Sequence, residues 1–160
     1  MSGISRKNTW VGGLIYASGD SFASWLIGEF SYQRMVAMAI LGGTLYAWEI
    51  PTYFQHLDRR FQQPGRLNSL QRMLCAVIFF NPLWIARHLA FIRLITGQWQ
   101  TIGLELLVIA GQSFMYILPV SFVGNYLIQN KVALTYRYFA SSLFSAFIAI
   151  YFALSEVLFG

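Results

Sequence analysis

The chain has 160 residues, of which 57% are hydrophobic and only 11% are charged, and its mean hydropathy is +0.54. Soluble domains carry roughly 25% charged residues, so this composition excludes an ordinary soluble domain and indicates a membrane protein. The net charge is +5. The basic residues lie beside apolar blocks and form no continuous basic face, which argues against a nucleic-acid partner.

Five apolar blocks follow one another and predict an all-α polytopic transmembrane bundle, with residues 1–160 as a single domain. The predicted spans are residues 10–28, about 35–57, about 67–96, about 99–128 and about 135–159. A bundle of four or six spans is the alternative. The opening residues are similar to the start of a signal peptide, but no cleavage site follows a short apolar core, so we expect them to be retained.

Prolines interrupt three of these spans. Pro51 lies late in the second span, and a proline removes one helical hydrogen bond and clashes with the preceding turn. Asn81-Pro82 suits an N-cap followed by a first helical position, so it predicts two half-helices or a kink in the third span. Pro119 lies inside the fourth span. We therefore expect kinks at all three prolines.

The basic residues also predict the orientation of the chain. With five spans, eight of them lie on the side of the N-terminus, and Arg34, Arg87 and Arg93 lie on the other. The positive-inside rule then places the N-terminus on the cytoplasmic or matrix-like side. We favour a bacterial inner membrane, with a mitochondrial inner or peroxisomal membrane as the second choice.

Small residues recur at helical spacing in the first and last spans. Such a ridge lets another membrane helix approach closely. The predicted packing ridges are Gly13, Ala17 and Ser21 in the first span and Ser141, Ser145, Ala149 and Ala153 in the last.

Asp20 lies near the middle of the first span. An ionisable group inside a membrane span costs roughly 2.5–3.5 kcal/mol on insertion scales, so it usually faces other helices or water. Two interpretations stay open: Asp20 lines a solute pathway, or it forms a structural ion pair. Arg34 and Arg87 are its candidate partners.

Further polar residues lie at membrane depth. Glu49, Arg87 and Asn125 join Asp20 as candidates for a pathway or binding site. Asn125 could instead bond the backbone of a neighbouring helix near Pro119, where a carbonyl is freed. Arg93 and Glu105 could reach the membrane interface, or could serve as ion-pair partners.

No pattern of metal or catalytic residues accompanies these polar groups. Cys75 is the only cysteine, and no Cys and His residues have metal-ligand spacing. We expect neither a metal nor a cofactor. Serines are plentiful, but none stands in a nucleophile-elbow pattern, so an intramembrane enzyme is only the third choice of function.

Short motifs stand in a recognisable order along most of the chain. They are Gly19-Asp20; Arg34, Gly42, Tyr53-Phe54 and Leu57-Asp58-Arg59; Arg72-Met73 and Pro82; and Leu118-Pro119, Asn125-Tyr126, Arg137, Tyr151 and Ser155. In these motifs the chain resembles the Mpv17/PMP22 family of small membrane proteins of mitochondria and peroxisomes. The resemblance implies a helical bundle that forms a pore or handles solutes. A weaker likeness to bacterial L-alanine exporters rests on residues 20–23 and 32–37.

Together these features predict a channel or transporter for a small polar solute in a lipid bilayer. The alternative is a non-transporting membrane subunit or an assembly protein that binds other membrane helices. A chain of 160 residues is small to enclose a wide path alone, so a homo-oligomer or a larger membrane complex fits this size.

Overall fold

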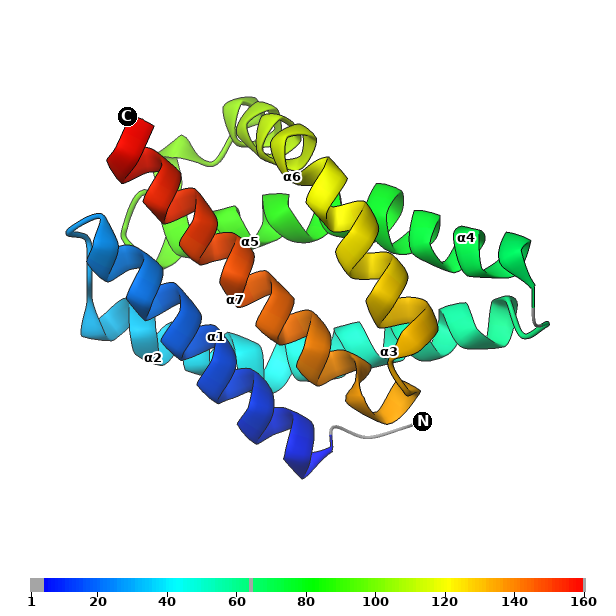
Figure 1. Ribbon diagram of the computed structural model, residues 1–160. Helices are drawn as coiled ribbons and strands as arrows, with labels where there is room; N and C mark the ends of the chain where they lie inside the picture. Colours follow the sequence, from blue (N-terminus) through cyan, green and yellow to red (C-terminus); the bar gives the residue numbers. More distant parts are fainter. Residues whose placement is uncertain (1–4, 64, 160) are drawn as a thin grey trace. The chain divides into compact units, whose positions relative to one another are not determined.

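The computed structural model describes residues 5–63 and 65–159, with side chains described to residue 150. Every regular element in this part of the chain is helical, and the helices join into five continuous segments (Figure 1). The segments are α1 (Arg6–Leu26); α2 (Tyr32–Leu41), the π-helical η1 (Gly42–Tyr46) and α3 (Ala47–Arg60); α4 (Arg66–Leu74), the π-helical η2 (Cys75–Phe80) and α5 (Asn81–Ile95); α6 (Leu104–Lys131), preceded by the 3-10 turn η3 (Trp99–Thr101); and α7 (Leu134–Phe159). The predicted all-α class is confirmed.

The helices belong to two compact units. The first unit comprises Met1–His56 and Ala133–Gly160, and the second comprises Leu57–Val132. The first therefore contains α1, α2, η1, most of α3, and α7, and the second contains the end of α3 together with α4, η2, α5 and α6. The single domain over residues 1–160 stays a prediction.

Two helical segments within the described residues are long and apolar enough to cross a membrane. They are Arg66–Ile95 and Leu104–Lys131, and both belong to the second unit. A hydrocarbon core needs about 20 mostly apolar residues in a helix. Their length and composition indicate membrane association, whereas the number of spans stays a prediction.

The prolines lie within helical segments. Pro51 is inside α3 and Pro82 is at the start of α5, and a π-helical segment precedes each of them along the chain. Asn81 has helical backbone angles of φ −61° and ψ −49°, so it does not cap a new helix. Of the two alternatives predicted at Asn81-Pro82, the pair of half-helices is wrong, because Arg66–Ile95 is one continuous helix, and the kink stays a prediction. A π-turn shifts the hydrogen-bond ladder by one residue and lets a helix continue through a local irregularity.

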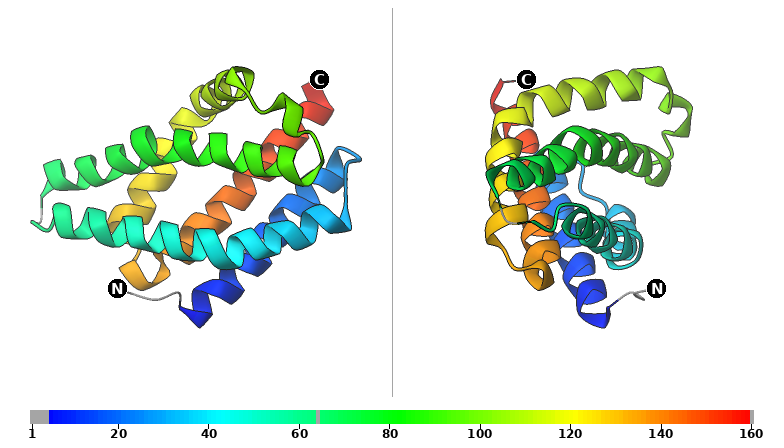
Figure 2. Two further views of the ribbon diagram at one scale, coloured as in Figure 1. Left: turned by 180° about the vertical axis from the view of Figure 1, so that it is seen from behind. Right: turned by 90° about the vertical axis from the view of Figure 1, so that its right-hand side faces the viewer.

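The fourth segment bends. Pro119 lies inside α6, and Figure 2 shows this helix changing direction where its ribbon turns from olive to yellow. Proline removes a hydrogen bond on one side of a helix and clashes with the carbonyl four residues earlier. The bend in this region agrees with the kink expected at Pro119.

Glycine allows very close packing within the first unit. A Cβ added at Gly12 on α1 would overlap the carbonyl of Gly42 and the hydroxyl of Tyr138. The same carbonyl of Gly42 accepts a hydrogen bond of 2.8 Å from Tyr138 Oη on α7. Helices α1, α7 and η1 are therefore held together at a point where two backbones touch.

The predicted small-residue ridges lie beside the closest contacts. Gly13, Ala17, Ser21, Ser141, Ser145 and Ala149 are half-buried. A Cβ at Gly19 would lie 2.6 Å from the Cβ of Ala146, and Ser142 is fully buried. In a helix, each step of four residues goes about 40° beyond one full turn. A row of residues spaced strictly four apart therefore drifts away from the face that contacts the neighbouring helix. The side chain of Ala153 lies outside the described residues.

The second unit contains a polar clasp between α4 and α6. Arg72 Nε and Nη2 donate to Asn130 Oδ1 at 3.2 and 3.0 Å, and Nη1 donates to the carbonyl of Phe61 at 3.1 Å. Asn130 Nδ2 donates in turn to the carbonyl of Ser69 at 3.1 Å. Arg72, in the last turn of α4, thus links this helix to the residue after α3 and to the end of α6.

The close contact at Gly12 predicts opposite effects on stability for two matched glycine-to-alanine substitutions. Gly12→Ala should lower the free energy of unfolding by about 1–3 kcal/mol, because overpacking forces the backbones apart. Gly111→Ala on α6 should raise it by about 0.5–1 kcal/mol, since alanine favours a helix and a Cβ there meets no other atom within 4 Å. Thermal unfolding in detergent measures both. A Gly12→Ala variant that unfolds at the same temperature as the wild type would contradict the close contact.

Candidate functional site

Asp20 on α1 and Arg34 on α2 form a buried, bidentate ion pair in the first unit. Arg34 Nε donates to Asp20 Oδ2 at 2.7 Å, and Nη2 donates to Oδ1 at 2.8 Å. Asp20 is 5% exposed and Arg34 is 9% exposed. Two parallel charge-assisted bonds are a strong and specific arrangement. Both carboxylate oxygens are engaged, which favours the interpretation of Asp20 as a structural residue.

The turn between α1 and α2 positions this pair. Gly28 has a φ of +77°, and the amide of Glu29 donates to the carbonyl of Ser24 at 2.8 Å, as at a helix end closed by a left-handed glycine. Ser31 then caps α2, because its side chain accepts a hydrogen bond from the amide of Arg34. A short connection therefore reverses the chain and directs Arg34 at Asp20.

The remaining charged candidates take different positions. Glu49 is half-buried on α3 in the first unit, and Arg87 is half-buried on α5 in the second. Arg93 donates to the carbonyl of Thr101, which ties the end of α5 to η3. Glu105 is exposed in the first turn of α6, where a negative charge complements the helix dipole.

A buried polar stripe runs along α6 after Pro119. Ser121, Asn125 and Gln129 follow at four-residue intervals, and their exposed fractions are 0%, 5% and 0%. Asn125 Nδ2 donates to the carbonyl of Ser121 at 3.0 Å. Asn125 thus bonds a backbone carbonyl of its own helix and not, as considered from the sequence, one of a neighbouring helix.

Two members of this polar stripe have unsatisfied polar atoms. Within the described residues, neither the oxygen nor the nitrogen of the Gln129 amide has a hydrogen-bond partner, and neither does the hydroxyl of Ser121. A buried polar group without a partner costs about 1–3 kcal/mol. These atoms are the strongest sign of a binding site in the second unit.

Sequence reasoning found Asn125 but missed Ser121 and Gln129. The signal was present in the four-residue spacing of three polar side chains in an otherwise apolar helix. Spacing alone does not show which face of a helix is buried. The structure therefore adds two site residues that the sequence analysis did not name.

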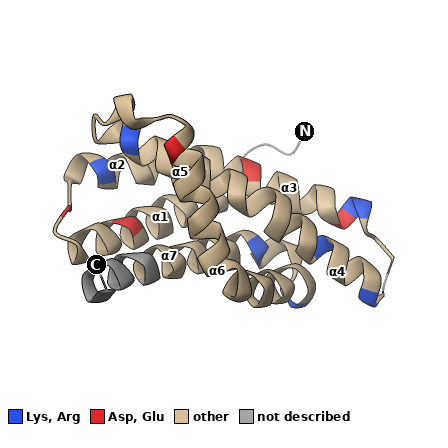
Figure 3. Cartoon of the chain, turned by 90° about the horizontal axis from the view of Figure 1, so that it is seen from above, with Lys and Arg blue, Asp and Glu red and all other residues tan. Residues whose placement is uncertain are grey.

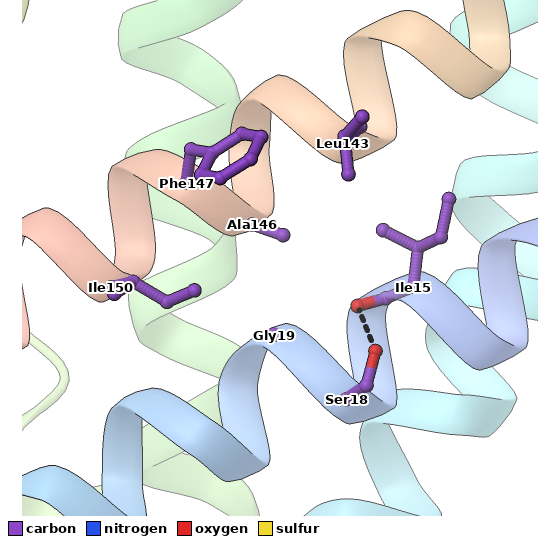
Figure 4. A pocket seen from close by; sticks show the side chains of 7 residues that line it. All are labelled: Ile15, Ser18, Gly19, Leu143, Ala146, Phe147 and Ile150. Atoms are coloured by element: carbon purple, nitrogen blue, oxygen red, sulfur yellow. Dashed lines mark hydrogen bonds between the residues drawn. The ribbon is translucent and has the colours of Figure 1, made fainter.

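A shallow groove of about 200 Å³ lies between α1 and α7 in the first unit (Figure 4). It is lined by Ile15, Ser18, Gly19, Leu143, Ala146, Phe147 and Ile150. The only hydroxyl among these side chains, on Ser18, donates to the carbonyls of Leu14 and Ile15 on its own helix. The groove is therefore apolar, and it is suited to an acyl chain or to a side chain of another helix.

Comparisons of the chain with protein families, curated proteins and solved structures found no match. Among the described residues, no three His, Cys, Asp or Glu side chains gather to form a metal site. The fold therefore defines a broad class of protein. The chain is an all-helical protein with helices apolar enough for a membrane.

The ion pair predicts that substitutions of Asp20 and Arg34 have coupled effects on the free energy of unfolding. Asp20→Asn should lower the free energy of unfolding by about 3–5 kcal/mol, because it leaves the buried guanidinium of Arg34 without a countercharge. The double variant Asp20→Asn/Arg34→Gln should be more stable than Asp20→Asn alone. Glu29→Gln, at an exposed carboxylate in the same turn, is the control. All variants are compared by thermal unfolding in detergent. A loss of stability in the double variant equal to the sum of the losses from the two single substitutions would contradict the coupling.

Proposed function

We propose that the protein is a multi-pass membrane channel or transporter that conducts a small, neutral polar solute along the polar stripe of α6. The observation that carries this proposal is the fully buried Gln129, whose amide has no partner among the described residues. Unsatisfied polar groups cost several kcal/mol in a bilayer. A site for a passing polar molecule gives this amide a role.

The chemistry of the polar stripe supports a neutral solute. Its side chains are two amides and one hydroxyl, which together offer both hydrogen-bond donors and acceptors. None of them carries a charge that would offset the desolvation of an ion. Small amides and polyols match this pattern of donors and acceptors.

In this proposal Asp20 is a structural residue and does not bind the solute. Its carboxylate is neutralised by Arg34 through two short bonds. A solute would have to break a buried ion pair to reach it, at a cost of several kcal/mol. Glu49, Arg87 and Asn125 stay candidates for the pathway.

The five helical segments are proposed to be five spans, with the N-terminus on the cytoplasmic or matrix-like side. The excess of basic residues on that side supports this orientation. The resemblance to the Mpv17/PMP22 family supports solute handling. A bacterial inner membrane is the favoured location.

Gln129→Leu tests the proposal against Gln112→Leu, which makes the same change at an exposed position of the same helix. Wild-type protein in proteoliposomes should accelerate the entry of urea or glycerol, followed by stopped-flow light scattering. Gln129→Leu should slow this entry by about tenfold or more, because a hydrogen bond in a buried site is worth roughly 1–3 kcal/mol. The same variant should unfold at a higher temperature, since it removes an unsatisfied amide.

Other outcomes would contradict the proposal. Equal entry rates for Gln129→Leu and Gln112→Leu would show that the polar stripe is not the path. A wild-type rate equal to that of empty liposomes would exclude transport of these solutes. A rise in potassium chloride flux alone would exclude a neutral solute.

A second candidate function is a non-transporting membrane subunit. The apolar groove between α1 and α7 favours it, because an apolar surface lined by both helices suits a side chain of another membrane helix. This function predicts no solute flux and co-purification with a larger membrane complex.

A further inference from the structure

We infer that the adjoining ends of α3 and α4 bind the headgroup of an anionic phospholipid. The inference rests on the membrane location proposed above, but it does not depend on solute transport. We call the site the arginine turn and define it by Arg59, Arg60, Arg66, Leu67 and Leu70. All five residues belong to the second unit.

The cations of the arginine turn are exposed. Arg59 and Arg60 end α3, Arg66 begins α4, and among the described residues their guanidinium groups have no hydrogen-bond or ion-pair partner. Figure 3 shows blue segments at the adjoining ends of α3 and α4. Arginine binds phosphate oxygens through two parallel N–H bonds, so this cluster suits a phosphate group.

The nearby carboxylate, Asp58, forms an ion pair with Arg72. Asp58 lies 4.0 Å from Arg72 Nη1, and Arg72 also donates to Asn130 and to the carbonyl of Phe61. This clasp connects the residue after α3 with α4 and α6.

Exposed leucines follow directly on the cations. Leu67 is 68% exposed and Leu70 is 46% exposed, and residues three apart lie on the same face of a helix. Free phosphate would use the arginines alone. A phospholipid would also bury the leucines against its acyl chains, so the combination of both groups favours the lipid.

The position of the arginine turn along the chain also favours a lipid. It lies at the start of the apolar helix Arg66–Ile95, which is long enough to cross a bilayer. Basic residues at the end of a membrane helix lie at the level of the headgroups, where anionic lipids attract them. A nucleic acid would use the arginines and would leave the leucines exposed.

Native mass spectrometry of the full chain in detergent, with equal amounts of phosphatidylglycerol and phosphatidylcholine, tests the inference. The wild type should bind phosphatidylglycerol with a preference of about fivefold or more, the effect expected for one basic residue near a headgroup. The variant Arg59→Gln/Arg60→Gln/Arg66→Gln should lose this preference. Leu67→Gln/Leu70→Gln should weaken the binding of both lipids.

Arg66→Gln and Arg6→Gln form the matched control. Each removes one exposed arginine from the first residue of a helix, but only Arg66 belongs to the arginine turn. Arg66→Gln should lower the preference for phosphatidylglycerol, and Arg6→Gln should leave it unchanged. Gln129→Leu should also keep the preference, so a failure of the transport proposal is recognised separately.

Three results would overturn the inference. The first is equal binding of both lipids by the wild type. The second is a loss of preference in Arg6→Gln as large as that in Arg66→Gln. The third is complete displacement of phosphatidylglycerol by excess inorganic phosphate. The first would show that the turn does not select anionic lipid. The second would show a general effect of charge, and the third would show a site for free phosphate.

Discussion

The ion pair between Asp20 and Arg34 is the contact on which the arrangement of the first unit depends. A buried carboxylate is tolerated only where a partner offsets its desolvation, and here the partner comes from the next helix through a turn at Gly28. The pair restrains α1 against α2. The contact of Gly12 with Gly42, and the bond from Tyr138 to the same carbonyl, then join η1 and α7 to α1.

The second unit contains both paired and unpaired buried polar groups. Arg72 and Asn130 satisfy one another and nearby carbonyls at one end, whereas Gln129 and Ser121 are buried without partners in the described part of the chain. The contrast separates two roles for polar groups in an apolar bundle. Paired groups hold helices together, and the unpaired groups are the ones assigned to the proposed solute path.

The prolines show which features of a helix can be predicted from a few neighbouring residues and which cannot. Pro51, Pro82 and Pro119 were recognisable as irregular points, since proline removes a hydrogen bond wherever it stands. A π-turn precedes the first two prolines, and the chain continues as one helix through Asn81-Pro82. The capping signal of Asn81 was overridden because the residues on both sides form an apolar helix. Helical propensity is a weak signal compared with such a context.

The amino-acid sequence by itself determined the helices, because long apolar blocks separated by short polar turns leave few alternatives. All five helical segments begin and end within five residues of their predicted ranges. Only the tertiary structure decided that Arg34 is the partner of Asp20, that Gly12 and Gly19 make the closest contacts, and that Ser121 and Gln129 are buried. Each of these depends on how a helix is rotated about its own axis. Contacts between residues far apart in the chain set that rotation, and an apolar sequence with weak amphipathic periodicity does not specify it.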